Sequence, residues 1–173
     1  MKDFLAQAAA HFEEIAHQLN ALDAAIGDGD HGATILKGLR AAADADESPE
    51  KAFRKAAGGA SGSLFAQVIA ALAKAENGAP LNEALGFAAE RIAMLGSGQA
   101  GDKTMLDALI PAAAANTPAT AAQAAEIGRL TTKDMAAKRG RAKHVEGAGV
   151  GHIDAGATSV AVLLQLYADW KAK

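Results

Sequence analysis

The sequence predicts an all-α protein, and two features of its composition support this prediction. Half of the 173 residues are hydrophobic but only 4% are aromatic, so the core must be built mainly from Ala, Leu, Ile and Val. Alanine is the best helix former, whereas the β-branched and aromatic runs that strands prefer are scarce. The length suits a single domain, residues 1–173, with a core of its own.

Apolar spacing and helix start and stop signals predict about eight helices. The first is the clearest, because apolar residues recur at alternating three and four positions from Leu5 to Leu22. Ser48-Pro49 and Thr117-Pro118 each have the pattern of an N-cap followed by proline at the first helical position. Pro111 should kink or shorten its helix. The predicted helices are 5–23, one beginning near 32, 49–57, 64–75, 80–95, 104–115, 117–138 and 158–170.

Glycine-rich polar segments occur at four of the predicted helix junctions. They span residues 23–34, 58–62, 96–105 and 139–156. If alternate junctions of an up-and-down bundle meet at one end, these four segments form a single site. Loops on a rigid scaffold commonly carry binding residues, so one site built from four loops is expected.

The first segment carries three carboxylates, Asp23, Asp28 and Asp30, within eight residues. Their mutual repulsion requires a counter-charge, which a hard divalent cation with oxygen ligands supplies. A calcium-binding EF-hand is excluded, because Ala33 and Leu39 stand where that loop requires glycine and glutamate. A solvated turn with helix-capping aspartates remains the alternative for this segment taken alone.

The other segments offer groups that suit phosphate. His31 can donate to a phosphoryl oxygen, although loop histidines are more commonly structural. Residues 58–62 lead into a helix whose free amides attract anions; an ordinary turn capped by Ser61 is the alternative. Arg139 and Arg141 have planar donors suited to phosphate, or they form a solvated basic helix end.

Residues 96–104 contain two apparent nucleotide-binding motifs that the context rejects. The G-x-G-x-x-G of residues 96–101 follows a predicted helix, whereas a dinucleotide-binding fingerprint requires a preceding strand. Asp102 interrupts the Gly-Lys-Thr that a P-loop requires. The four segments together still provide a metal clamp, two glycine-rich anion sites and an arginine. This combination suits phosphoryl transfer.

Charge and composition exclude several other function classes. The net charge is −3 and no basic stripe is present, so a nucleic-acid partner is not expected. No polybasic segment or long apolar stretch indicates a membrane partner, and the N-terminus does not have the pattern of a signal peptide. The absence of cysteine excludes disulfides and thiolate metal sites. A cytoplasmic location is expected.

Residues 22–32, 58–62, 101–105, 138–142 and 151–159 resemble the L subunit of bacterial dihydroxyacetone kinases and the matching domain of single-chain dihydroxyacetone kinases. The resemblance implies an eight-helix antiparallel up-and-down barrel with the nucleotide site formed by loops at one rim. It implies two Mg²⁺ ions held by Asp23, Asp28 and Asp30, with ADP or ATP as the nucleotide. The nucleotide-binding residues it implies are His31, Gly32, Ala33, Thr34, Ala60, Ser61, Gly96, Met105, Arg141, Asp154, Ala155 and Gly156.

The resemblance also implies partners. In that family a separate K subunit binds the ketose, so this chain would be a phosphotransferase subunit that is inactive alone. A phosphotransferase-system phosphocarrier subunit and a homodimer are compatible with it, and both free ATP and resident ADP recharged by a phosphoenolpyruvate-dependent relay stay open. Ala155 stands where the family usually has proline. A non-catalytic nucleotide-sensing regulatory protein of the same fold is the alternative, because the aspartates indicate only metal and nucleotide binding.

Overall fold

The computed structural model describes residues 1–46 and 48–173, and within them the protein is all-helical, as the composition predicts. No strand occurs in this part of the chain. Three short 3-10 turns, η1 (Thr132–Asp134), η2 (Ala142–His144) and η3 (Glu146–Gly149), lie between the last two helices. The α-helices are α1 (Lys2–Ala24), α2 (His31–Asp44), α3 (Pro49–Ala57), α4 (Gly59–Glu76), α5 (Leu81–Gly96), α6 (Leu106–Ala113), α7 (Pro118–Thr131) and α8 (Ala155–Lys171).

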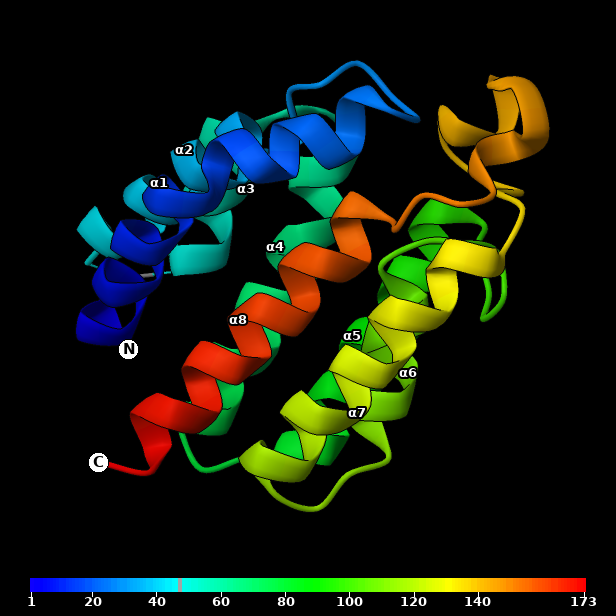
Figure 1. Ribbon diagram of the computed structural model, residues 1–173. Helices are drawn as coiled ribbons and strands as arrows, with labels where there is room; N and C mark the ends of the chain where they lie inside the picture. The colour runs from blue at the N-terminus through cyan, green and yellow to red at the C-terminus, as the bar shows by residue number, and fades with distance from the viewer. Residues whose placement is uncertain (47) are drawn as a thin grey trace.

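The helices form a closed sequence of neighbours (Figure 1). Each α-helix packs against the next one along the chain, and α8 returns to pack against α1. Residues 25–30 and 132–154, which follow α1 and α7, lie beside each other at one end of the molecule, and both termini lie at the opposite end. None of the described helices is long and apolar enough to cross a lipid bilayer.

Small residues allow the helices to approach closely. A Cβ atom on Gly32 of α2 would collide with the carbonyl oxygen of Ala16 in α1. A Cβ atom on Gly128 of α7 would meet the carbonyl oxygen of Asp107 in α6 in the same way. Alanine is the commonest residue type in the buried core, where it packs beside leucine, isoleucine and valine, as the composition predicts.

Two of the predicted helix starts that border the candidate site differ from the structure. The predicted loop 58–62 is largely the first turn of α4, which begins at Gly59 after Gly58 takes up a φ of +69°. Ser61 therefore lies inside the helix and is not its N-cap. The last helix begins at Ala155, three residues before the predicted start, because the Asp154 carboxylate accepts the Ala157 amide at 2.7 Å.

The predicted helix 117–138 is too long. The capping box between Thr117 and Thr120 confirms its start. However, α7 ends at Thr131, where the hydroxyl groups of Thr131 and Thr132 donate to the carbonyls of Gly128 and Arg129. These side-chain bonds compete with helical continuation and end the helix without glycine or proline.

Candidate functional site

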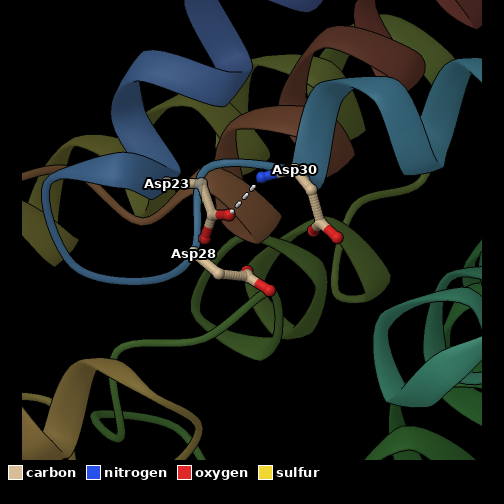
Figure 2. A group of neighbouring side chains, drawn as sticks. All are labelled: Asp23, Asp28 and Asp30. Atoms are coloured by element: carbon tan, nitrogen blue, oxygen red, sulfur yellow. Dashed lines mark hydrogen bonds between the residues drawn. The ribbon is translucent and has the colours of Figure 1, made fainter.

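The connection after α1 is folded by its own first carboxylate (Figure 2). Oδ2 of Asp23 accepts the amides of Gly29 at 2.9 Å and Asp30 at 3.1 Å. Gly27 makes this possible, because a Cβ atom there would collide with Asp23 Oδ1. Gly29 has a φ of +79°, which favours glycine. The loop is therefore built to bring its aspartates together.

The three aspartates form one cluster of oxygen atoms. One carboxylate oxygen from each of Asp23, Asp28 and Asp30 lies within 4.8 Å of the other two. Asp23 is half-buried, whereas Asp28 and Asp30 are exposed. Three like charges at this separation repel one another, and an all-oxygen set is what hard divalent cations such as Mg²⁺ prefer. The chemistry of the donors thus fits the expected metal.

Arg141 supplies a positive charge to the same cluster from far along the sequence. Its Nη1 atom forms an ion pair with Oδ1 of Asp28. Arg141 lies between α7 and α8, and Asp28 lies between α1 and α2. The pair therefore joins two of the four segments that the sequence predicts to meet.

A cavity of about 540 Å³ opens beside the aspartates, and residues from all four predicted segments line it. This volume is within the range of small-molecule sites. The expectation that the four segments form a single site is confirmed in geometry. The predicted residues that line the cavity are Asp23, Asp28, Asp30, His31, Thr34, Ala60, Ser61, Gly96, Met105, Arg141, Asp154, Ala155 and Gly156.

Two predicted nucleotide-binding residues, Gly32 and Ala33, are not among those that line the cavity. Gly32 is buried against α1, where it permits the close approach of the two helices. The amide of Ala33 donates to Oδ1 of Asn20 at 3.1 Å. Asn20 thus satisfies one of the unpaired amides at the start of α2, a structural role that no local sequence signal indicates.

His31 is a buried residue at the first position of α2. Its Nε2 atom lies 2.8 Å from the hydroxyl oxygen of Ser159 in α8, which fixes the orientation of the ring. Burial lowers the pKa of His31, and the nearby charges of Asp23 and Asp30 oppose that effect. Burial therefore favours the neutral form of the ring, which lies between the aspartate cluster and α8.

Asp154 combines a structural bond with an unfavourable environment. Its carboxylate caps α8, but the surrounding protein atoms desolvate it and raise its pKa to about 6. The cap bond to Ala157 and the charge of Lys103 oppose the increase, whereas Asp107 and Asp23 add to it. The residue is only part-exposed at the cavity wall.

The sequence did not single out several residues that line the cavity. Lys103 and Thr104 add polar groups, beside Arg139, which the sequence had already indicated as a candidate for phosphate. Apolar side chains form another part of the wall: Ile26, Leu64, Ile92 and Leu106. Leu64, Ile92 and Leu106 continue ordinary helical core patterns, so their sequence context gives no sign of a second role.

Comparison with known proteins agrees with this architecture. The model of the DAK2 domain matches residues 25–169. The chain is 33% identical to D-erythrulose kinase from Mycolicibacterium smegmatis, over 96% of this chain and 34% of the relative. It is 32% identical to the ADP-binding subunit DhaL of PEP-dependent dihydroxyacetone kinase 1 from Listeria innocua, over 87% of this chain and 85% of that subunit.

A solved structure gives the same result. The crystal structure of the dihydroxyacetone kinase from C. freundii in complex with AMP-PNP and Mg²⁺ superposes with a TM-score of 0.77 at 26% identity. The match covers 98% of this chain and 33% of the kinase chain. The all-helical fold of this chain is therefore shared with the C. freundii kinase. This chain belongs to the DAK2 domain family.

Proposed function

We propose that this chain is the nucleotide-binding subunit of a dihydroxyacetone-type, short-ketose kinase. It would hold Mg-ADP or Mg-ATP and transfer phosphate to a ketose bound on a separate K subunit. The observation that carries the proposal is the convergence of three aspartate oxygens within 4.8 Å at a cavity lined by all four junction segments. The similarity of this chain to an ADP-binding kinase subunit from Listeria innocua supports the same function.

Asp23, Asp28 and Asp30 are the residues that would hold two Mg²⁺ ions. Bound magnesium would offset the negative charge of the phosphate oxygens during phosphoryl transfer. Two backbone amides already hold Asp23 Oδ2, so this carboxylate is oriented by the loop itself. The other two carboxylates are exposed at the cavity.

The remaining residues that line the cavity fall into two groups, one suited to the phosphates of the nucleotide and the other to its base. The first turn of α4 presents Ala60 and Ser61, and amides at a helix start attract anions. Arg141 adds a guanidinium suited to phosphate oxygens. Leu64, Ile92 and Leu106 offer an apolar surface for a purine ring. In this proposal residues 1–173 form one domain. The groups that bind and activate the ketose are those of the partner K subunit.

The first experiment is to denature the freshly purified protein and identify released nucleotide by mass spectrometry, then to titrate the emptied protein with Mg-ADP and Mg-ATP by calorimetry. We expect ADP to be released, or either nucleotide to bind. If neither result is obtained, the proposed function is wrong.

Kinase activity requires a second measurement. The chain is incubated with dihydroxyacetone and Mg-ATP, with and without a dihydroxyacetone-binding K subunit, and dihydroxyacetone phosphate is assayed. If ATP exchanges freely, we expect product only when both proteins are present. If ADP is resident, we expect product only when the phosphoenolpyruvate-dependent phosphocarriers are added as well. Turnover by the chain alone would contradict the split-enzyme proposal. Tight nucleotide binding without transfer to any ketose would favour the nucleotide-sensing alternative.

A further inference from the structure

The connection between α7 and α8 extends away from the helices, and hydrogen bonds join its two ends. This joined part is here named the base of the connection. The amide of Gly151 donates to the carbonyl of Lys133 at 2.7 Å, and the amide of Asp154 donates to Thr132 Oγ1 at 3.0 Å. Residues 133–151, here named the arginine segment, carry Arg139 and Arg141 and include no α-helix. Contacts with the rest of the protein must therefore set the position of this segment.

Lys103 holds both sides of this base. Its ammonium group donates to the carbonyl of Thr132 at 2.6 Å and also to the carbonyl of His152. The side chain is 1% exposed, and the residue has a φ of +60°, a left-handed conformation that residues with a side chain seldom adopt. Such conformations persist where the surrounding structure fixes them, and they concentrate at functional sites.

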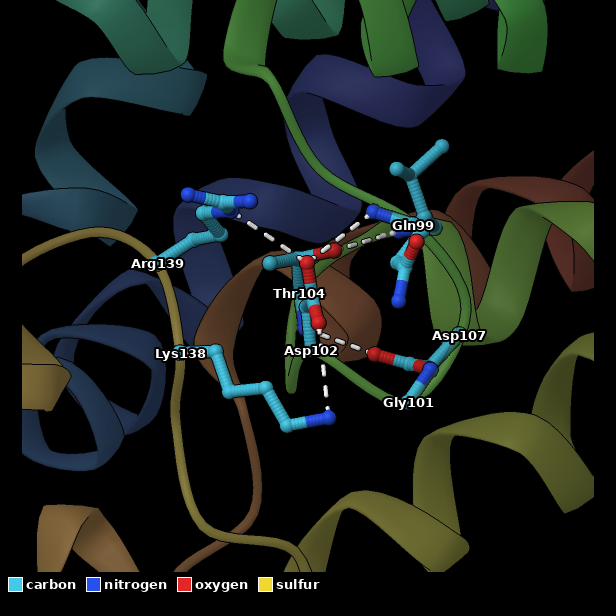
Figure 3. Close-up of polar contacts among 8 residues, drawn as sticks. Gln99, Gly101, Asp102, Thr104, Asp107, Lys138 and Arg139 are labelled. Atoms are coloured by element: carbon cyan, nitrogen blue, oxygen red, sulfur yellow. Dashed lines mark hydrogen bonds and ion pairs between the residues drawn. The ribbon is translucent and has the colours of Figure 1, made fainter.

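The preceding residue, Asp102, holds the arginine segment beyond its base (Figure 3). Its Oδ2 atom accepts Arg139 Nε at 3.3 Å and the amide of Gln99 at 3.1 Å. Its Oδ1 atom lies 3.6 Å from Lys138 Nζ, and its carbonyl oxygen accepts the Lys138 amide at 3.1 Å. Asp102 is 1% exposed, so a buried carboxylate has its charge balanced by two cations of one segment.

The arginine segment also packs on the loop that carries the aspartates. Ala137 and Ala142 form a small buried cluster with Ile26, which lies two residues before Asp28. Arg141 lies next to this cluster and reaches Asp28. The position of the segment thus determines whether the Arg141 guanidinium reaches the cavity.

We infer that Asp102 and Lys103 are positioning residues that hold the arginine segment so that Arg141 faces the aspartate cluster. The inference rests on the proposed function only for the identity of the ligand that Arg141 meets. Asp102 is not among the residues that line the cavity, and the ammonium group of Lys103, which does line it, is bonded to the carbonyls of Thr132 and His152. Both residues therefore act through the position of Arg141. Asp102 bonds to Lys138 and Arg139 within the segment, whereas Lys103 bonds to carbonyls at its base. Two adjacent residues of the connection between α5 and α6 thus hold the segment at two different places.

Native trypsin digestion tests the positioning directly. The arginine segment contains trypsin sites at Lys133, Lys138, Arg139, Arg141 and Lys143. We expect Asp102→Asn to be cut within the segment at least about tenfold faster than the wild type, because cleavage follows the population of the released state. Asp169→Asn, which removes an equal charge from the exposed far end of α8, should be cut at the wild-type rate. Equal rates for Asp102→Asn and the wild type would overturn the inference.

Mg-ADP affinity in two backgrounds separates positioning from general damage. In the otherwise wild-type protein we expect Asp102→Asn to raise the Kd for Mg-ADP about tenfold, whereas in an Arg141→Ala background it should change the Kd less than about twofold. Lys103→Met should behave in the same way. An equal increase in both backgrounds would show a structural effect and would contradict the inference.

A second variant and the digestion rates keep the inference testable if Asp102→Asn does not fold or if the proposed function is wrong. If the circular dichroism melt shows that Asp102→Asn is unfolded, the double variant Lys138→Gln, Arg139→Gln removes the same ion pairs from their exposed side. It also removes two trypsin sites, so its faster cleavage relative to the wild type is expected, and is compared, at Lys133, Arg141 and Lys143. If the wild type fails to bind Mg-ADP, the proposed function fails, whereas the digestion rates still decide the positioning claim.

Discussion

The guanidinium of Arg141 is paired with the carboxylate of Asp28, one of the three residues proposed to hold magnesium. A metal ion and a phosphate group would each compete for one partner of this pair: the ion for Asp28 and the phosphate for Arg141. Metal and nucleotide should therefore bind more favourably together than separately. Arg141 would act as an internal counter-charge while the cluster is without its cation.

Arg141→Ala should change the affinities for metal and for nucleotide in opposite directions. We expect Mg²⁺ to bind the nucleotide-free variant more tightly, by no more than about fivefold, because an exposed ion pair is worth at most about 1 kcal/mol. The Kd for Mg-ADP should rise about tenfold, because a charge-assisted hydrogen bond is lost. Calorimetric titrations measure both, with Lys143→Ala as the control in the same segment. A decrease in both affinities would contradict the competition.

Asp30→Asn should weaken nucleotide binding in a way that depends on the metal. The Asp30 side chain makes no capping bond to α2, so the amide should leave the helix start unchanged. We expect the Kd for ADP to rise tenfold or more in Mg²⁺ and to change little in EDTA, because a carboxylate ligand is removed. Asp169→Asn is the matched control. Equal weakening in Mg²⁺ and EDTA would rule out Asp30 as a metal ligand.

Gly32→Ala should destabilise the fold and not only the site. The added Cβ atom collides with the Ala16 carbonyl, so α1 and α2 must separate, at a cost of at least about 2 kcal/mol. Gly86→Ala is the control, because Gly86 lies inside α5 and, apart from its own helix backbone and chain neighbours, no atom lies within 4 Å of the added Cβ. It should stabilise the protein by about 0.5 to 1 kcal/mol through helix propensity. Urea unfolding measures both, and similar effects would contradict the packing argument.

Asp154→Asn should change how stability depends on pH. Because the pKa of Asp154 is raised to about 6, the folded state binds more protons than the unfolded state between about pH 4 and 6. Its ionisation therefore makes the wild type less stable as pH rises through that window. Asparagine stays neutral and still caps the helix.

The variant should therefore be more stable than the wild type at pH 7.5, by about 2 kcal/mol once partial solvent exposure is considered, and nearly equal to it at pH 4.5. Urea unfolding in EDTA at the two pH values measures the difference. A stability gap that is the same at both pH values would show that the Asp154 pKa is not raised.

Local signals in the sequence were sufficient for the existence of the helices and for the convergence of the four segments at one cavity. Thr117-Pro118 marks a helix start because its capping box needs only neighbouring residues. The aspartate spacing indicates an oxygen cluster, since Gly27 and Gly29 allow the loop to turn back on Asp23. The alternation of loops along an up-and-down chain then places the four segments together.

What the sequence did not reveal depends on contacts between distant residues. Asp102 was interpreted as the residue that breaks a P-loop motif and as part of the family-like residues 101–105, with no partner assigned. In the structure it bonds to Arg139, and Lys103 bonds to carbonyls of Thr132 and His152. Nothing within a few residues of either position indicates these partners. The end of α7 was placed too late for a related reason, because a threonine hydroxyl, and not a glycine, ends it.

The placement of the two chain ends affects how this protein can be joined to others. Both lie at the opposite end of the molecule from the aspartate loop, and the N-terminus is separated from that loop by the length of α1, about 35 Å at 1.5 Å per residue. An affinity tag, a fluorophore or a further domain attached at either end would leave the mouth of the cavity free. A partner that delivers a phosphate acceptor can therefore approach the rim whether it is a separate protein or is tethered by a linker long enough to span that distance.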